Sequence, residues 1–213
     1  MGLVDLINRR RTTRHFEPDG LFLPRETIEE MIIQASAIPS EFGVKPWRFI
    51  IVRDRERKQV LYECAYGQDL IRQAAAVIIV CGDTRVDALV GKNLEKKVDE
   101  GLITADEAKT RLEIVRKTIE SSPRARLQMA VRTPSFAAFA LMLLATERGL
   151  ATASVSGFSE EAIRRAFHMS DRFIPVQLVA IGIPSMQHPN ASSASTESTS
   201  QFIFHEDMGL TDI

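Results

Sequence analysis

The sequence predicts a single domain that combines α-helices and β-strands, and three observations lead to this fold class. The chain has 213 residues, of which 45% are hydrophobic, enough for one sizeable core. The run AVIIVC within residues 75–81 is short, continuous and rich in β-branched residues, which is typical of a central strand. Other segments repeat apolar residues at helical spacing, so we expect helices to cover the strands.

The elements expected in the first half follow from apolar spacing and from Pro and Gly punctuation. Pro24 suits the first turn of a helix, and three Pro and Gly residues interrupt the segment before Trp47. In chain order we expect a helix at 3–8, a helix at 24–37, a loop at 38–47, a buried strand at 49–52, a helix at 55–63 and a strand at 75–81.

The second half begins with a charged segment, 92–121, in which apolar residues are spaced for two amphipathic helices. Thr104 and Glu107 have the spacing of a capping box, so a helical hairpin should leave the core here. We then expect an almost wholly apolar, buried helix at 136–147 ended by Gly149, a strand at 152–155, a helix at 159–167 capped by Ser159, a strand at 176–183, a flexible linker at 190–200 in a tail spanning 189–213, and a short strand at 202–204.

Composition excludes several classes of function. The net charge is −1, so no basic or acidic field predicts a nucleic-acid or membrane partner. We expect no apolar run to approach the roughly 20 residues of a membrane span. The basic cluster follows the first apolar stretch, unlike a secretory signal, so we expect a cytoplasmic protein. Cys64 and Cys81 lack CxxC spacing and the four histidines are scattered, so we expect no disulfide framework and no metal site.

Three segments could carry chemistry. The first contains Arg10, Arg11, Thr12 and Arg14, whose guanidinium and hydroxyl groups match phosphate geometry. The second runs from Pro39 to Trp47. The third, 149–158, is dominated by small residues that suit a flat ring lying against backbone. Each also has a plainer interpretation: a solvated basic turn, a tight connection with a buried tryptophan, and close packing of helix on sheet.

Taken in order, the three segments resemble the nitroreductase family. That family has an early Arg-Arg-Ser-x-Arg, here 10–14, and a Pro-Ser-x-x-Asn-x-Gln-Pro-Trp loop, here 39–47. Its Gly-Leu-Gly-x-x-x-x-Gly-Gly-Phe segment is similar to 149–158, and its strand ending in Gly-x-Pro is similar to 181–184. The resemblance covers most of the chain, and the order and spacing of the motifs carry it.

The resemblance implies an α+β fold in which helices flank a mostly antiparallel sheet, and a homodimer with FMN at the subunit interface. Arg10 and Thr12 would hold the FMN phosphate with Ser40 alongside, and Arg11 would lie nearby. Arg14 would stabilise negative charge at the pyrimidine edge of the flavin. The remaining implied cofactor-binding residues are Gln68 at the polar ring edge and Val155, Ser156 and Gly157 along the ring, where a backbone N–H would reach flavin N5.

Three departures from the family pattern concern the cofactor. Gly43 replaces the family's Asn and loses a side-chain hydrogen bond, whereas Lys45 replaces its Gln and brings a second positive charge near the pyrimidine. The basic C-terminal phosphate ligands have no match, because 189–200 contains no Lys or Arg. Either hydroxyl groups there replace them, or phosphate binding depends on the N-terminal cluster alone.

The leading functional hypothesis is an oxidoreductase that passes hydride from NADH or NADPH through FMN to a nitroaromatic, a quinone or another small electrophile. This chemistry needs no side-chain nucleophile, so we predict no catalytic side chain. A second hypothesis keeps FMN but uses it in another reaction. A third is a non-catalytic dimer that has lost the flavin and binds a partner through the charged hairpin.

Overall fold

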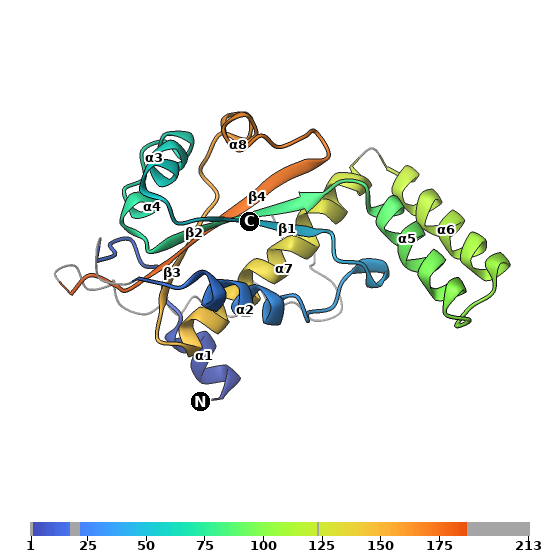
Figure 1. The fold of residues 1–213 in the computed structure, drawn as a ribbon, viewed down its shortest axis with the longest axis horizontal. Coiled ribbons are helices and arrows are strands. Elements are labelled where there is room, and N and C mark those ends of the chain that lie inside the picture. Colours follow the sequence, from blue (N-terminus) through green and yellow to red (C-terminus); the bar gives the residue numbers. More distant parts are fainter. Residues whose placement is uncertain (1, 18–21, 123, 187–213) are drawn as a thin grey trace, which may run out of the picture.

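The computed structural model describes residues 2–17, 22–122 and 124–186, and its centre is a four-stranded antiparallel sheet (Figure 1). The strand order is β1-β2-β4-β3. The strands are β1 (Trp47–Val52), β2 (Ala76–Asp83), β3 (Ala151–Val155) and β4 (Phe173–Gly182). The helices are α1 (Leu3–Arg9), α2 (Arg25–Ala35), α3 (Arg55–Cys64), α4 (Leu70–Gln73), α5 (Val86–Asp99), α6 (Ala105–Glu120), α7 (Ala125–Glu147) and α8 (Glu160–Ala166). The predicted α+β class is confirmed.

Two cores form on the two faces of the sheet because neighbouring residues of a strand point to opposite sides. In β2, every residue is buried. Val77, Ile79 and Cys81 pack on the side of α3, α4 and α8, whereas Ile78 and Val80 pack on the side of α2 and α7. Figure 1 shows these helices as separate layers above and below the sheet.

Helix ends follow the predicted capping chemistry. Thr104 Oγ1 accepts a hydrogen bond from the Glu107 amide at 3.2 Å, and the Glu107 carboxylate accepts from the Thr104 amide at 2.8 Å, which completes the capping box of α6. Ser159 Oγ caps α8 by accepting a hydrogen bond from the Ala162 amide at 3.2 Å. After α7, Gly149 has φ +76°, and the Leu150 amide bonds back to the Ala145 carbonyl at 2.9 Å, which closes a Schellman turn.

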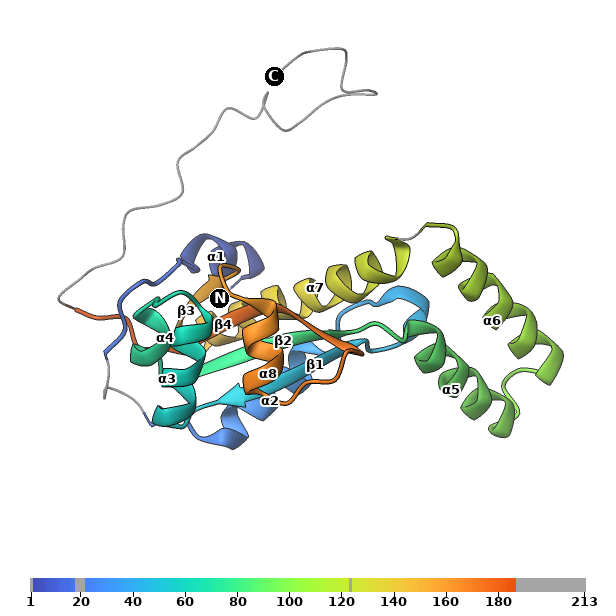
Figure 2. The same cartoon turned by 90° about the horizontal axis from the view of Figure 1, so that it is seen from above.

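The hairpin of α5 and α6 projects away from the sheet (Figures 1 and 2). It begins at Val86 rather than at the predicted Lys92. Val90 and Leu94 of α5 meet Val115 and Ile119 of α6 in a third, smaller core, which Val44 and Met129 of the main fold also join. This third core explains how a strongly charged segment keeps its helices while it leaves the main fold.

Two predictions about burial were wrong. The strand at 49–52 was expected to be buried, but β1 is an edge strand and its residues from Phe49 to Ile51 are only half-buried. Helix α7 begins at Ala125, well before the predicted start, and Phe136 and Phe139 are 53% and 45% exposed. An apolar run therefore showed where a helix lies, but not that one chain covers all of its faces.

Helix α7 is also long and apolar enough to cross a membrane by length and composition, contrary to the expectation that no run would be. Half of its most apolar window is buried inside the fold, where it packs on β2 and β4. These contacts are those of a core helix. The predicted linker at 190–200 and strand at 202–204 lie outside the described residues.

Candidate functional site

The arginine segment follows α1 and runs beside the end of the sheet formed by β3 and β4. The Thr13 amide donates to the Thr152 carbonyl at 2.9 Å, and Thr12 forms a parallel bridge with Thr152. Further on, Phe16 is 2% exposed and forms an antiparallel bridge with Pro184. The segment therefore has two fixed points, Thr13 and Phe16, with Arg14 exposed between them.

The three arginines differ in what they bind. The guanidinium of Arg11 turns back and donates to the carbonyls of Asn8 and Arg10, the latter at 3.0 Å. Among the described residues, no acceptor binds the guanidinium of Arg10 or of Arg14. These two cations are free to bind an external anion, whereas Nη1 of Arg11 is engaged at the end of α1.

A hollow of about 340 Å³ lies beside Arg10, between the end of α1 and the turn that leads into β3. Its walls combine arginines with main chain and small side chains, a donor set that suits a phosphate. The lining residues are Arg9, Arg10, Arg11, Thr13, Thr146, Glu147, Gly149, Leu150, Ala151, Thr152 and Pro184. Sequence reasoning missed Arg9 and Thr152, although Arg9 adjoins the predicted cluster.

The predicted ring-binding residues meet at the other end of β3. Gln68 Nε2 donates to the Gly157 carbonyl at 2.8 Å and to the Ala65 carbonyl at 3.0 Å. Ser156 and Gly157 are exposed, whereas Val155 is buried in the core. The structure therefore brings Gln68 and Gly157 together and leaves the adjoining backbone open to a planar ligand, but Val155 presents no side-chain surface.

The segment at 39–47 contains a single 3₁₀ turn from Glu41 to Gly43. Gly43 has φ +66°, a backbone conformation that the family's Asn also tolerates. Ser40 is half-buried and Lys45 is exposed. Trp47 is buried and donates from Nε1 to Ser36 Oγ at 3.0 Å, so the plainer interpretation holds for the tryptophan itself.

Within one chain, Ser40 and Lys45 lie far from Arg10. Glu41 binds Arg132 in the first half of α7 at 2.8 Å, whereas the hollow beside Arg10 includes Glu147 at the end of α7. A helix rises about 1.5 Å per residue, so these two anchor points are about 22 Å apart. Figures 1 and 2 both show α1 and the segment before β1 at separate ends of α7. Ser40 and Arg10 of one chain therefore cannot bind the same phosphate.

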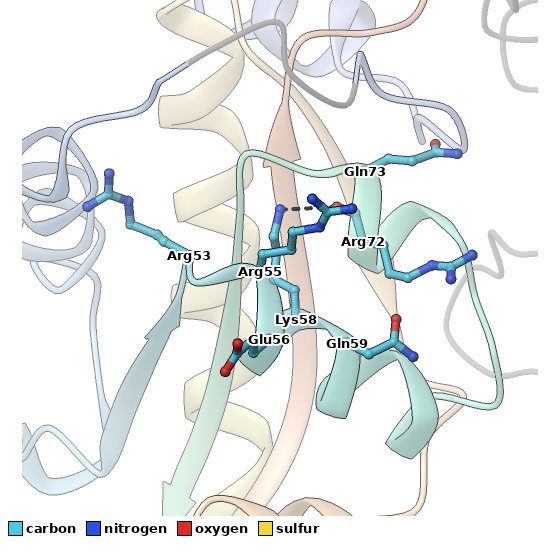
Figure 3. A pocket seen from close by; sticks show the side chains of 7 residues that line it. All are labelled: Arg53, Arg55, Glu56, Lys58, Gln59, Arg72 and Gln73. Atoms are coloured by element: carbon cyan, nitrogen blue, oxygen red, sulfur yellow. Dashed lines mark hydrogen bonds between the residues drawn. The ribbon is translucent and has the colours of Figure 1, made fainter.

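A larger hollow of about 840 Å³ lies between α3 and α4, outside the predicted site (Figure 3). Lys58 reaches into its floor and donates to the carbonyls of Arg72 at 3.0 Å and Ala74 at 2.6 Å. Arg72 stacks over Tyr62 at 4.0 Å and pairs with Asp69. These charged groups hold α3 and α4 together.

The described residues contain no group of three or more His, Cys, Asp or Glu placed to hold a metal ion. Cys64 and Cys81 are both buried and free of disulfides. Burial raises the pKa of Cys81 to about 12, so this thiol stays protonated at neutral pH. The candidate site therefore offers binding and electrostatics rather than a nucleophile.

Comparisons with known proteins identify relatives of this chain in sequence and in fold. The profile described as "Nitroreductase family" matches residues 7–183. YodC of Bacillus subtilis, assigned to the NAD(P)H nitroreductases, is 27% identical over 179 residues, which cover 84% of this chain and 88% of YodC. The crystal structure of ydfN from the same organism, assigned as a nitroreductase, has a TM-score of 0.86 at 24% identity, covering 95% and 97% of the two chains. An Exiguobacterium sibiricum structure, similarly assigned and in complex with FMN, has a TM-score of 0.77 at 24% identity, covering 90% and 92%.

Proposed function

Because the chain belongs to the Nitroreductase family, we propose that it binds FMN and transfers hydride from NADH or NADPH to a nitroaromatic, a quinone or another small electrophile. The family and the oxidoreductase class were predicted from the sequence, and the profile match confirms both. One observation carries the FMN proposal: Arg10 and Arg14 have no acceptor among the described residues, and Arg10 borders a hollow at the end of the sheet.

The N-terminal segment would hold the phosphate. Arg10 offers paired donors on the wall of the hollow, and Thr12 adds an exposed hydroxyl beside β3. Residues 189–200 contain no Lys or Arg to match the basic C-terminal ligands of the family. Arg10 would therefore neutralise more of the negative charge of the phosphate. Arg11 would contribute less, since its guanidinium binds the end of α1.

The other end of β3 would hold the flavin ring, which when bound supplies the atom that accepts and donates hydride. Gln68 Nε2 holds the Gly157 carbonyl at 2.8 Å. Because residue 157 is glycine, it places no β-carbon against the side-chain amide of Gln68, where one would lie 3.5 Å from Nε2. The exposed backbone of Ser156 and Gly157 would orient the ring, and Arg14 would stabilise negative charge at its polar edge. The chain thus contributes orientation and electrostatics.

We further propose a homodimer in which Ser40, Gly43 and Lys45 of the partner subunit complete each site. Two observations support it. The distance along α7 separates these residues from Arg10 of their own chain, and α7 exposes Phe136 and Phe139 together with Leu127 at 51%. Interfaces that cover such permanent apolar surface typically exceed about 2,000 Å². Sedimentation at low micromolar concentration should give roughly twice the 23.8 kDa chain mass.

Complementation between two variants tests whether the site is shared. Arg10→Ala and Lys45→Glu homodimers should each bind FMN weakly. Chains refolded together would form heterodimers in which one site carries both changes and the other carries neither, so a fraction of strong sites should return. If every ligand came from one chain, mixing would restore nothing, and a monomer that holds FMN would also refute the shared site.

The purified, FMN-reconstituted protein tests the function itself. Bound flavin absorbance after removal of free FMN is expected, followed by NAD(P)H oxidation that depends on an added nitroaromatic or quinone. Binding without such turnover would favour another flavin reaction. Failure to bind FMN at micromolar concentration in equilibrium dialysis would favour the non-catalytic dimer and end the proposal.

A further inference from the structure

Helix α4 contacts both halves of the proposed cofactor site through two glutamines. Gln68 lies just before the helix and donates to the Gly157 carbonyl at 2.8 Å. Gln73 is the last residue of the helix, and its Oε1 accepts the Phe16 amide at 3.2 Å. The ring segment and the arginine segment, although they are distant in sequence, are therefore attached to the same short helix.

Phe16 is well placed to fix the arginine segment. Its ring packs where Gly182 has no side chain, since a β-carbon at 182 would lie 2.9 Å from Phe16 Cδ1. The Glu17 amide donates to the Ile183 carbonyl at 3.0 Å, and the Ser185 amide donates to the His15 carbonyl at 2.9 Å. The end of β4 therefore holds this segment from one side while Gln73 holds it from the other.

The backbone around Gln73 is itself fixed. Lys58 is buried, and its Nζ donates to the carbonyls of Arg72 and Ala74, the residues on either side of Gln73. Figure 3 shows Lys58 reaching toward Arg72, with Gln73 among the residues that line the hollow. Because the backbone on both sides of Gln73 is held, only its side-chain torsions remain to be fixed when Oε1 accepts the Phe16 amide.

We propose that Gln73 is a positioning residue of the cofactor site. Its amide oxygen sets where Phe16, and therefore Arg14 two residues earlier, lies relative to the Gly157 backbone that Gln68 holds. Gln73 does not itself touch the cofactor. This inference rests on the proposed function, because it assigns Gln73 a role in matching the phosphate and ring parts of an FMN site.

Two variants of Gln73 separate the hydrogen bond from the packing. Gln73→Leu keeps a similar volume but removes the acceptor, whereas Gln73→Glu keeps an oxygen that can accept the Phe16 amide. Gln59→Leu is the matched control, because Gln59 on α3 bonds only to the exposed Glu63 carboxylate among the contacts described for it. The measurements are the FMN dissociation constant, the visible spectrum of bound flavin, and hydrogen–deuterium exchange of the Phe16 peptide in the FMN-free protein.

We expect Gln73→Leu to weaken FMN binding about 5- to 10-fold, the scale of one hydrogen bond, and to shift the flavin spectrum. It should also speed exchange of the Phe16 peptide, while Gln73→Glu and Gln59→Leu stay close to wild type. If the wild type binds FMN and Gln73→Leu matches it in affinity and spectrum, the positioning role is overturned while the function stands. Equal losses in Gln73→Leu and Gln59→Leu, or no rescue by Gln73→Glu, would overturn it as well. A wild type that binds no FMN defeats the function itself and this inference with it.

Discussion

The two ends of β4 use arginine in opposite ways. Near Phe173, the fully buried Asp83 carboxylate accepts two hydrogen bonds from Arg172, at 2.8 and 2.6 Å, and lies 3.5 Å from Arg48. Near Gly182, Arg10 and Arg14 have no such acceptor among the described residues. The same side chain therefore serves the fold at one end of the sheet and is available to a ligand at the other.

The two ends of β4 differ in whether a carboxylate of the described chain binds the arginines there. A carboxylate at the end of a central strand is costly to bury alone, so arginines must accompany it. The arginine segment is held by backbone hydrogen bonds at Thr13 and Phe16. The guanidiniums of Arg10 and Arg14 are therefore not needed to hold the segment in place. Anchoring a loop through its backbone is thus what frees its side chains for binding.

The largest effect should come from breaking the buried pair. Asp83→Ala removes the acceptor for Arg172 and for the Arg85 amide, which now donates to Asp83 at 3.0 Å. We expect a loss of about 2–3 kcal/mol in the free energy of unfolding, below the usual range for a buried pair because Arg172 is 32% exposed and can be hydrated. Urea denaturation of the FMN-free protein measures it.

The matched control is Asp171→Ala. Asp171 binds Arg164 at 2.7 Å but is fully exposed, so its loss should cost no more than about 1 kcal/mol. Equal losses in the two variants would mean that burial of Asp83 adds nothing to its ion pair.

The converse change at the other end should affect binding and not folding. Arg10→Ala should weaken FMN binding by roughly 1.5–3 kcal/mol, the scale of a hydrogen bond to a charged group. The unfolding free energy of the FMN-free protein should stay within about 0.5 kcal/mol of wild type, because Arg10 has no internal acceptor among the described residues. Fluorescence titration with FMN measures the first effect, and Arg55→Ala, which changes an exposed arginine at the start of α3, is the control. Unchanged affinity in Arg10→Ala would place the phosphate elsewhere.

A smaller effect should appear on acidification. Burial alone would raise the pKa of Asp83, but hydrogen bonds from Arg172 and from the Arg85 amide outweigh it and hold the pKa below its ordinary value. A carboxyl whose pKa is lower in the folded state stabilises the protein above the unfolded pKa, near 3.9, and loses that contribution as pH falls through the folded value. Wild type should therefore lose stability below about pH 4 more steeply than Asp83→Asn. Parallel slopes in urea midpoints between pH 3 and 6 would contradict this.

Local chemistry made much of the fold predictable. The capping pair of Thr104 and Glu107, the apolar run of β2 and the glycine after α7 each act over a few residues, so the sequence shows them directly. The burial of β1 and of α7 was misjudged because exposure depends on neighbours distant in sequence, or in another chain. Spacing alone cannot report which face of an apolar helix is covered.

For the candidate site, the sequence indicated residues expected to face the ligand but not the residues that hold them in place. The family resemblance implied Gln68 and Gly157 as cofactor-binding residues, and the structure joins these two by a hydrogen bond. No sequence signal marked Gln73, because its contact with Phe16 spans 57 positions and glutamine has no fixed partner type. Motifs record the residues that face a ligand, whereas the residues that hold those segments in place become visible only in three dimensions.

The smallest effect, and the sharpest test of the comparison, is expected at Arg11. It sits between Arg10 and Thr12 in the family motif, yet its guanidinium donates to the carbonyls of Asn8 and Arg10, so it belongs with the arginines that serve the fold. Side-chain donors commonly satisfy the free carbonyls at a helix end in this way, at a net gain of about 0.5–1.5 kcal/mol. Arg11→Ala should therefore leave FMN affinity within about twofold, which is about 0.4 kcal/mol, while exchange of the α1 amides rises in the FMN-free protein. If Arg11→Ala instead weakens FMN binding as much as Arg10→Ala, the guanidinium of Arg11 binds the ligand as well, either through the nitrogens other than Nη1 or by leaving the helix end, and internal partners would no longer distinguish the two kinds of arginine.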